Sequence, residues 1–454
     1  MNPEKLQSVY FLGAGGIGVS ALARYFQVRG VKVCGYDRSP SRLTGELIME
    51  GIPIHFQEDI SLIPSDIQLV IYTPAIPSDN QEWIHLKNLG IPMVKRAEAL
   101  GMIAGSHQTL AVAGTHGKTS TSSIAAQILH SSAQGCTAFL GGISKNHNSN
   151  LLLSDTSPWL VTEADEFDRS FLHLHPRMAV ITAIDADHLD IYLTFGNLLN
   201  AYRDFAAQVQ SEGLLIVKQG LEHLLTGYCH CPLLTYSLSD SGADYYASDI
   251  KVTGDSYTYT LWCRETRIEE VRMNVPALMN IENSVAAAAL AFEAGCTPEE
   301  IRKGIGSFKG IRRRFEKIHS HHDFHVYDDY AHHPEEITAL AQSLRHLYPD
   351  CKITAIFQPH LYSRTRDFAD GFASSLQLFD EVYLLDIYPA RELPLRGVDS
   401  GMIARKMTPH PRIVTQEEAF NLITSRQQGV MVTVGAGDIE KLALLAEQYF
   451  IQHT

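Results

Sequence analysis

Apolar and polar residues alternate along the first hundred positions in a way that is typical of a parallel sheet covered by helices. The apolar run SVYFL (8–12) predicts a strand, GAGGIG (13–18) a tight turn, and residues 19–30 a helix. A second strand, VKVCGY (31–36), ends at Asp37. This order of strand, glycine turn, helix, strand and acid is the βαβ pattern that binds a diphosphate. Further strand-like runs are 69–76 and 91–95.

The middle of the chain repeats the strand–turn–helix order. TLAVA (109–113) predicts a strand, and a helical pattern begins near Lys118 and runs to 130. The runs 159–168 and 178–190 predict strands that end in acidic clusters, where α/β sheets bind ligands. We expect antiparallel strands, added to this parallel core, between about 213 and 275, and a closing helix over 280–295.

A basic run, KGIRRRFE (309–316), lies where a linker is expected. Four strand patterns with helical stretches between them follow it and predict a third α/β domain. The expected fold is therefore α/β in three domains: a Rossmann-like sheet, a P-loop ATPase-type sheet and a second Rossmann-like sheet. The expected boundaries are 1–104, 105–314 and 315–454.

Composition agrees with a compact protein of several domains. The 454 residues are 45% hydrophobic and 19% charged, and the length suggests about three domains. A net charge of −14 argues against nucleic-acid binding and against an anionic membrane surface. Seven cysteines, an odd number, favour reduced thiols. No run approaches the ~20 apolar residues of a membrane span, and glycines interrupt the apolar N-terminal run, so we expect a cytoplasmic protein.

The first glycine turn fits G-x-G-x-x-G at Gly13, Gly15 and Gly18. Residues without side chains let a diphosphate approach the backbone at a helix N-terminus. Together with Asp37 the pattern favours a dinucleotide or a nucleotide sugar, and it leaves open which of the two binds.

The second glycine turn, GTHGKTS, resembles a P-loop in which Val112 replaces the first glycine and Gly114 follows. Backbone N–H groups, Lys118 and the helix N-terminus would meet at one phosphate. The hydroxyl of Thr119 would hold Mg²⁺. The turn therefore predicts ATP binding.

An acidic run after the next predicted strand supplies Glu163, Asp165, Glu166 and Asp168. Mg²⁺ prefers oxygen ligands, so one or two of these acids with Thr119 would suffice. A solvated acidic loop is the alternative interpretation. His188 could ligand a metal or orient a substrate carboxylate, or be purely structural.

Two other clusters resemble metal sites at first sight. Cys229 and Cys231 flank a histidine but lack a second Cys/His pair at zinc spacing. The histidine-rich run 319–325 falls on an expected strand or loop, with a single acid, Asp323, and no thiol in it. We interpret both as loops.

Taken together, the motifs resemble those of one family, the Mur ligases, which are ATP-dependent amide-forming enzymes that build the peptide of bacterial cell-wall precursors. The resemblance covers essentially the whole chain. The motifs that carry it are GTHGKTST, EADEFD, DADHLD, MNIENSVAAAA, RRRFE and DDYAHHPEE. GAGGIGVSALA, FQPHLYSRTRDF and LLDIYPARE resemble the alanine-adding branch.

The resemblance implies an activity. ATP would phosphorylate the lactyl carboxylate of UDP-N-acetylmuramate, and the amine of L-alanine would displace phosphate from the acyl phosphate, in peptidoglycan precursor synthesis. ATP and Mg²⁺ would be required. The implied partners are these small molecules, with no nucleic acid and no membrane, and the protein would be a monomer or a homodimer.

The resemblance also implies residue roles. The sugar nucleotide would be held by Gly13, Gly15, Gly16, Gly18, Asp37, Thr73 and Arg96. ATP would be held by Gly114, Thr115, His116, Gly117, Lys118, Thr119, Ser120, Asn280, Asn283, Arg314 and Asp329. Lys118, Glu166 and His188 would be catalytic, and Thr119, Glu166 and His188 would bind metal. The amino-acid pocket would be lined by Tyr330, His332, His360 and Arg364.

The chain departs from the family pattern in places. Leu361 stands where relatives often carry arginine, and residues 191–209 lack the lysine that sibling ligases carbamylate. Three alternatives stay open: a ligase that recycles a whole tripeptide, an NAD-dependent oxidoreductase and a non-catalytic nucleotide-gated binding protein. The choice among L-alanine, glycine and L-serine is also open, because it depends on pocket shape.

Overall fold

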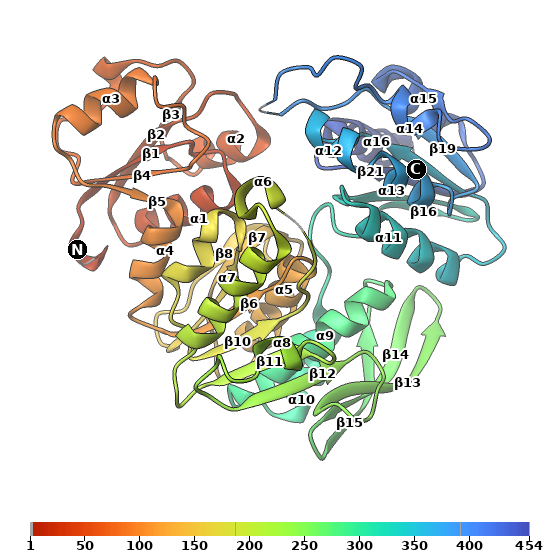
Figure 1. Cartoon of the computed structure of the whole chain (residues 1–454), viewed down its shortest axis with the longest axis horizontal. Helices are drawn as coiled ribbons and strands as arrows, with labels where there is room; N and C mark the ends of the chain where they lie inside the picture. The colour runs from red at the N-terminus through yellow and green to blue at the C-terminus, as the bar shows by residue number, and fades with distance from the viewer. Residues whose placement is uncertain (1–2, 187, 391, 454) are drawn as a thin grey trace. The chain divides into compact units, whose positions relative to one another are not determined.

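The computed structural model describes residues 3–186, 188–390 and 392–453. The chain forms two compact units. The first comprises Met1–Ile250, Thr258–Arg272 and Glu282–Phe308, and the second Lys251–Tyr257, Met273–Ile281 and Lys309–Thr454. Both are α/β structures on mostly parallel sheets, as predicted (Figure 1). The division at 104/105 and 314/315 stays a prediction.

The first unit begins with a five-stranded parallel sheet in the order β3-β2-β1-β4-β5. Its strands are β1 (Ser8–Leu12), β2 (Lys32–Tyr36), β3 (Ile54–His55), β4 (Leu69–Tyr72) and β5 (Met93–Lys95). Its helices are η1 (Pro3–Lys5), α1 (Ile17–Val28), α2 (Arg42–Met49), η2 (Ile60–Leu62), α3 (Gln81–Asn88) and α4 (Arg96–Ala104). The predicted βαβ unit is confirmed.

Alternation along β1 divides the two faces of this sheet. Val9 and Phe11 join the core that includes α1 and α4, whereas Tyr10 and Leu12 pack in a second cluster with Leu86 of α3. Helices therefore cover both faces. This leaves the carboxyl ends of the strands, where the glycine turn lies, open to a ligand.

A ten-stranded sheet forms the middle of the chain, in the order β15-β14-β13-β12-β11-β10-β6-β9-β7-β8. Its first six strands are β6 (Gln108–Ala113), β7 (Thr137–Ser144), β8 (Ser149–Leu152), β9 (Trp159–Ala164), β10 (Met178–Ile181) and β11 (Leu214–Lys218). The others are β12 (Leu233–Ser237), β13 (Tyr245–Thr253), β14 (Ser256–Cys263) and β15 (Thr266–Met273). The helices are α5 (Lys118–His130), η3 (Phe167–His173), α6 (Leu189–Tyr192), α7 (Phe195–Gln208), α8 (Glu222–Leu225), α9 (Leu278–Glu293) and α10 (Pro298–Ser307).

β6, which leads into the predicted P-loop, lies between β9 and β10 and pairs with both in parallel. The acidic ends of β9 and β10 therefore flank the turn. β11 pairs in parallel with β12, and β12 with β13, although we expected antiparallel strands from about 213. The reason is that β11 and β12 are joined through α8 rather than by a hairpin. The hairpin β7–β8 supplies an antiparallel pair at the other edge.

The second unit contains a six-stranded sheet in the order β16-β17-β21-β18-β19-β20. Its strands are β16 (Glu316–His321), β17 (Phe324–Asp329), β18 (Ile353–Phe357), β19 (Glu381–Leu384), β20 (Arg412–Ile413) and β21 (Gly429–Val434). Its helices are α11 (Pro334–Leu347), α12 (Tyr362–Asp367), α13 (Ala369–Leu376), α14 (Gly401–Ala404), α15 (Gln416–Ser425) and α16 (Ile439–His453). Apart from the antiparallel hairpin β16–β17, the strands are parallel.

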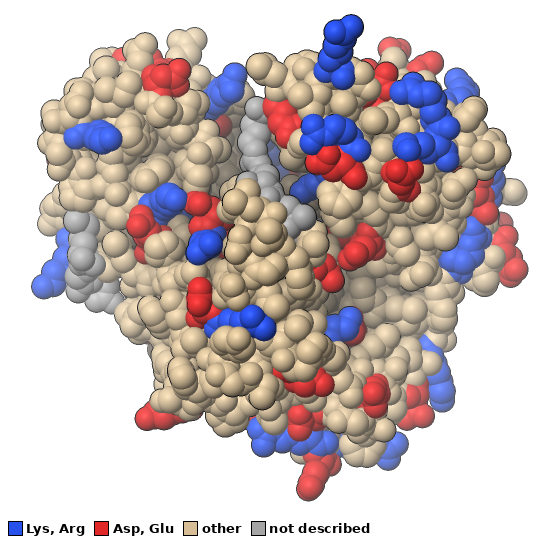
Figure 2. Space-filling view, in the orientation of Figure 1, with Lys and Arg blue, Asp and Glu red and all other residues tan. Residues whose placement is uncertain are grey.

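Among the helices of the described residues, none has the length and apolarity needed to cross a membrane. On the face drawn in Figure 2, basic and acidic side chains of the described residues lie interspersed over the surface. That face therefore carries mixed charge.

Candidate active site

The first glycine turn connects β1 to α1. Gly13 has a left-handed backbone, with φ of 85°, and its N–H donates to the carbonyl of Tyr36 at 2.8 Å. The Gly15 N–H donates to Oδ2 of Asp37 at 2.7 Å. Asp37, at the end of β2, thus holds the turn through its backbone.

Neighbouring side chains close around this turn. A Cβ on Gly13 would collide with Cγ2 of Thr73. On Gly15 it would lie 2.9 Å from Oδ2 of Asp37, and on Gly18 2.9 Å from Nη1 of Arg96. The structure therefore brings together the predicted sugar-nucleotide residues Gly13, Gly15, Gly18, Asp37, Thr73 and Arg96. Gly16 is the N-cap of α1.

The second glycine turn connects β6 to α5, which begins at Lys118. Gly114 and Gly117 have φ of 133° and 81°, a backbone region that favours glycine. A Cβ on Gly114 would collide with Thr182, and one on Gly117 would lie 2.8 Å from Oδ1 of Asn283. These close approaches leave no room for a side chain at either position.

The amide of Thr115 in this turn donates to the carbonyl of Ala183 at 3.1 Å, and its hydroxyl donates to Oδ2 of Asp185 at 3.2 Å. The neighbouring strand end therefore holds the turn. Ser120 lies partly buried in the first turn of α5. The turn brings the N-terminus of α5, a thirteen-residue helix, next to Lys118. Its free backbone N–H groups could therefore hold a phosphate there.

Lys118 forms the centre of this site. Its Nζ donates to Oε2 and Oε1 of Glu166 at 2.7 and 3.0 Å and to the carbonyl of Gly114 at 2.7 Å. Burial alone would lower the pKa of Lys118, but the carboxylates of Glu166 and Asp165 outweigh it and raise the pKa. The ammonium is therefore charged and fixed in place.

Thr119 and Glu163 form a second pair beside it. The Thr119 hydroxyl donates a hydrogen bond to Glu163, whose Oε1 also accepts from the Gly141 N–H at 2.8 Å. Desolvation raises the pKa of Glu163, because it outweighs the attraction of Lys118 and the Thr119 hydrogen bond. A carboxylate and a hydroxyl side by side are oxygen donors of the kind that Mg²⁺ prefers.

His188 follows β10 with a left-handed backbone, φ 53°. Its Nε2 lies 3.7 Å from Oε1 of Glu166, and its ring contacts Phe167 edge-on at a centroid distance of 5.3 Å. The structure therefore places Lys118, Glu166 and His188 together, with the Glu166 carboxylate between the lysine ammonium and the imidazole ring.

The two asparagines predicted to contact adenine and ribose lie on α9. Oδ1 of Asn283 accepts from the Thr121 hydroxyl at 3.3 Å and lies against Gly117 of the P-loop turn. Asn280 lies one turn earlier and donates to the carbonyl of Val275 at 3.2 Å. Both side chains are buried. Asn283 is therefore part of the ATP-type turn.

In the second unit, Arg314 and Asp329 lie close to the predicted amino-acid residues. The guanidinium of Arg314 is 5.1 Å from the centre of the Tyr330 ring. The carboxylate of Asp329 accepts from the N–H groups of Phe315 and Ala331 at 2.7 and 2.8 Å. Burial raises the pKa of Asp329 despite the opposing charge of Arg314.

The four residues predicted for the amino acid form one cluster. Tyr330 and His332 have ring centroids 5.4 Å apart, and His332 and His360 are 6.2 Å apart. Burial lowers the pKa of His332, and the positive charge of Arg364 lowers it further. The cluster therefore combines aromatic rings with the guanidinium of Arg364, which suits the carboxylate of an amino acid.

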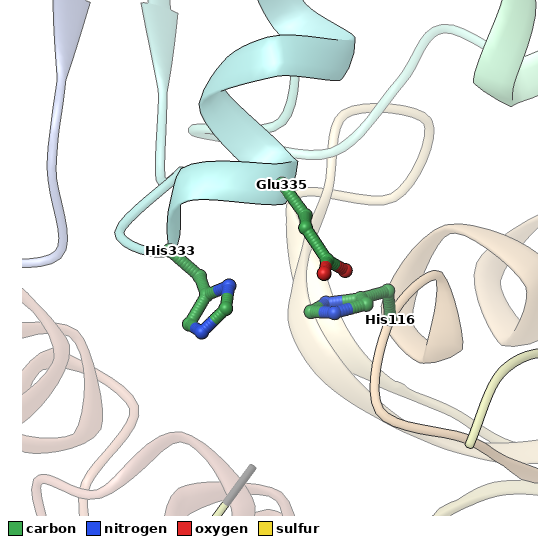
Figure 3. A group of neighbouring side chains, drawn as sticks. All are labelled: His116, His333 and Glu335. Carbon is green, nitrogen blue, oxygen red and sulfur yellow. The ribbon is translucent and has the colours of Figure 1, made fainter. Parts of the chain in front are cut away.

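His116 lies in the first unit, in the turn between β6 and α5, whereas His333 and Glu335 lie in the second unit at the start of α11 (Figure 3). Within the first unit, Nε2 of His116 lies 3.8 Å from Oδ2 of Asp185. Within the second, the ring of His333 lies edge-on to Phe368 at a centroid distance of 4.7 Å. His116 therefore belongs to the P-loop turn, as predicted.

Some residues of these clusters were not predicted. Tyr388 stacks on His360 at a centroid distance of 5.8 Å. It lies in the motif LLDIYPARE, so its position was visible although its role was not. Thr182 contacts the P-loop carbonyl of Ala113 at 3.1 Å, and nothing in the sequence singles it out.

Two glycine turns on parallel sheets and a lysine–carboxylate centre define a nucleotide-dependent ligase of the Mur type, and the chain belongs to the Mur ligase family. Three family models match it along its length. They are the Mur ligase family catalytic domain at residues 8–108, the Mur ligase middle domain at 112–291 and the Mur ligase glutamate ligase domain at 313–437.

Relatives of the whole chain carry a more particular name. A UDP-N-acetylmuramate–L-alanine ligase of Porphyromonas gingivalis is 48% identical over 98% of this chain and 99% of its own length. A Flavobacterium johnsoniae protein of the same name is 47% identical over 97% of each chain. The crystal structure of the UDP-N-acetylmuramate–alanine ligase of Thermotoga maritima matches with a TM-score of 0.84 and 26% identity, covering 98% of this chain and 100% of that one. A murein peptide ligase of Psychrobacter arcticus shares the fold, with a TM-score of 0.71, 22% identity and coverage of 97% and 98%.

Proposed function

We propose that this chain is a UDP-N-acetylmuramate–L-alanine ligase, which forms an amide at the expense of ATP during peptidoglycan precursor synthesis. The observation that carries the proposal is the presence of two separate glycine cradles in the first unit. One lies at Gly13–Gly18 beside Arg96. The other lies at Gly114–Lys118 beside Glu166. Relatives 44–48% identical, aligned over most of their length, bear this ligase name.

The reaction needs both cradles. The lactyl carboxylate attacks the γ-phosphorus of ATP, ADP leaves, and an acyl phosphate results. The amine of L-alanine then attacks the carbonyl carbon, and phosphate leaves as the amide forms. A free carboxylate is a poor electrophile, so phosphorylation supplies the leaving group, and Lys118 offsets the negative charge on the transferring group.

The residues of the first unit suit one Mg²⁺. Thr119 and Glu163 already share a hydrogen bond and offer two oxygen donors beside the P-loop. We assign these two as ligands, with Glu166 as the partner of Lys118 and a neighbour of the ion. A bound Mg²⁺ would neutralise phosphate charge. We propose that His188, whose Nε2 lies 3.7 Å from Oε1 of Glu166, orients the lactyl carboxylate or a second ion.

We further propose that Tyr330, His332, His360 and Arg364 bind the amino acid, with Arg364 facing its carboxylate. The substrates are polar small molecules, so we place the reaction in the cytoplasm. Oligomeric state, monomer or homodimer, is to be measured by sedimentation.

The decisive test mixes the purified protein with Mg-ATP, UDP-N-acetylmuramate and one amino acid at a time, and measures phosphate release and product mass. We expect turnover with L-alanine that exceeds turnover with glycine or L-serine. Turnover only with the tripeptide L-alanyl-γ-D-glutamyl-meso-diaminopimelate would instead identify a recycling ligase. Oxidation of NADH without ATP use would identify an oxidoreductase.

Lys118→Ala separates the two cradles. We expect turnover to fall by about a thousandfold or more, because the charge that faces the transferring phosphoryl group is lost. The affinity for UDP-N-acetylmuramate, measured by calorimetry, should change by less than about twofold. Lys303→Ala, at an exposed lysine on α10, is the matched control and should behave as the parent does. Equal loss of turnover and of sugar-nucleotide binding in Lys118→Ala would contradict two separate sites.

A further inference from the structure

The acidic turn after β9 connects the two cradles of the first unit. Oδ2 of Asp165 lies 3.9 Å from Nη2 of Arg96, which packs against Gly18 of the first glycine turn. Oδ1 of the same carboxylate lies 4.0 Å from Nζ of Lys118 in the P-loop. One side chain therefore faces a cation of each cradle.

A closer ion pair ties the same turn to the first sheet. Nζ of Lys95 lies 2.7 Å from Oδ2 of Asp168. Lys95 is the last residue of β5 and the N-cap of α4, directly before Arg96. The start of α4 thus holds the acidic turn at two adjacent residues, through Lys95 at hydrogen-bonding distance and through Arg96 at longer range.

The backbone of the turn needs such a constraint. Asp168 and Arg169 have φ of 52° and 56°, a left-handed region that residues other than glycine adopt uncommonly. Glu166, two residues earlier, accepts a hydrogen bond from Lys118. Its backbone carbonyl accepts one from the Tyr192 hydroxyl at 2.6 Å. The position of the Glu166 carboxylate therefore depends on a turn with two unusual backbone conformations in succession.

We propose that Lys95 is a positioning residue for phosphoryl transfer. Its pair with Asp168 holds the left-handed turn so that Glu166 and Asp165 keep Lys118 aligned, and this joins the sugar-nucleotide cradle to the ATP cradle. The inference rests on the proposed ligase function. It concerns a residue that binds neither nucleotide itself and acts through the turn.

The exposure of the pair distinguishes this role from a simple contribution to stability. The side chains of Lys95 and Asp168 are 39% and 35% exposed, and ion pairs this exposed contribute little to folding. Loss of the pair should therefore change kcat rather than Tm. Misplacement of a catalytic group by about 1 Å can slow a reaction roughly a hundredfold, so we expect a smaller shift of Lys118 to slow it severalfold.

The experiment uses the full-length protein and five variants. Lys95→Met and Asp168→Asn each remove one charge, and Asn still tolerates the left-handed backbone at 168. We expect kcat for ligation to fall by about three- to tenfold in each. Dissociation constants for UDP-N-acetylmuramate alone, and for a non-hydrolysable ATP analogue alone, should stay within about twofold. The double variant should be no slower than either single one, because both remove the same pair.

Two further variants make the result specific. Lys95→Arg keeps the charge and should retain at least about half of the parent kcat. Lys32→Met removes an exposed ion pair of similar length, 2.9 Å to Asp66, that does not touch the acidic turn, and should have the parent kcat. Three results would overturn the inference: an unchanged kcat in Lys95→Met, additive losses of kcat in the double variant, or an equal loss of kcat in Lys32→Met. In each case, ligation by the parent protein leaves the proposed function intact. A parent protein that forms no amide overturns both.

Discussion

Asp328 shows at the scale of a single residue how burial changes protonation. It lies near the end of β17 with 2% of its surface exposed, accepts from the Thr433 hydroxyl at 2.6 Å and lies 3.4 Å from Nε of Arg313. Burial raises its pKa to about 7, against the attraction of Arg313. An unfolded aspartic acid titrates near pH 3.9, about three units lower.

This difference makes the stability of the second unit depend on pH. Between about pH 4 and 7 the folded protein binds a proton that the unfolded chain does not. The stabilisation from that proton is complete below about pH 4 and is lost as the pH rises through about 7, at roughly 1.4 kcal/mol per pH unit. Asp328→Asn removes the titration.

We expect the Tm of Asp328→Asn, relative to the parent, to rise between about pH 5 and pH 8. Scanning calorimetry at the two pH values measures this difference. Asp323→Asn, at an exposed acid in the turn between β16 and β17, is the control and should follow the parent at both. Parallel curves for Asp328→Asn and the parent would show that Asp328 does not titrate in this range.

The sequence identifies which residue types could take part in the reaction, but not how all of them pair with one another. Lys118, Thr119 and the acidic run are visible because phosphate and Mg²⁺ chemistry need those side chains in that order. The pairing of Glu163 with Thr119 and of Glu166 with Lys118 was not visible, since the chain leaves the strand at Ala164 and turns through left-handed residues without any period. The metal ligands and site roles stay predictions.

At the scale of elements, α1 and its glycine turn depend on close approach to other elements. Gly18 is the second residue of α1, and a Cβ there would lie 2.9 Å from both Cδ and Nη1 of Arg96. These atoms belong to a flexible side chain that can move aside. An alanine at this position would therefore displace Arg96 from the cradle at little cost to folding.

Gly18→Ala should consequently weaken binding without unfolding the protein. We expect the dissociation constant for UDP-N-acetylmuramate to rise about tenfold or more, because the charge-assisted hydrogen bond that we propose between Arg96 and the diphosphate would be lost. Tm should change by less than about 3 °C, since a helix tolerates alanine better than glycine. Calorimetric titration and thermal unfolding measure the two effects. Gly45→Ala in α2, where the described residues leave space for a Cβ, should bind as the parent does.

Element types were predictable wherever apolar residues follow a period. Strands β1, β2, β4 and β5 of the first sheet, the two glycine turns and α5 were visible, because alternation and glycine spacing are local properties. The two-residue strand β3 is too short to show a period and was not predicted. Pairing in the later part of the ten-stranded sheet was not: β12 joins β11 in parallel. Whether two successive strands pair in parallel depends on how the chain between them crosses the sheet. The sequence of the connection through α8 does not show that it returns to the same end of the sheet.

For the larger first unit, one core joins the two cradles. Tyr25 of α1 contacts Phe139 of β7 at a centroid distance of 5.5 Å. Nearby, the buried Arg24 of α1 donates to Glu50 at 2.7 and 2.8 Å and to Oδ1 of Asn150 in β8 at 2.6 Å. The first sheet is thus fixed to the ten-stranded sheet by apolar and polar contacts, and we expect both sheets to melt together.

Arg24→Met tests this connection. It leaves Oδ1 of the buried Asn150 without its donor and removes two hydrogen bonds to the partly exposed Glu50, which should destabilise the unit by roughly 1–3 kcal/mol. We expect scanning calorimetry to resolve a new, earlier transition for the first sheet. Lys32→Met removes an exposed pair of 2.9 Å to Asp66, which does not bridge the two sheets, and should leave the trace unchanged. A single transition at the parent temperature in Arg24→Met would argue against the role of this cluster.

The ammonium of Lys118 meets three acceptors of its own protein, two on Glu166 and one on Gly114, and it has three hydrogens to give. An incoming anion must therefore displace the Gly114 carbonyl or an oxygen of Glu166 to reach it, and displacing Glu166 leaves that carboxylate without its cation. Free orthophosphate brings nothing to compensate that carboxylate, whereas a nucleotide chelated to a divalent ion supplies a new counter-charge for the displaced acid. Where Glu166 is displaced, we therefore expect Lys118 to favour a metal-chelated nucleotide over free orthophosphate.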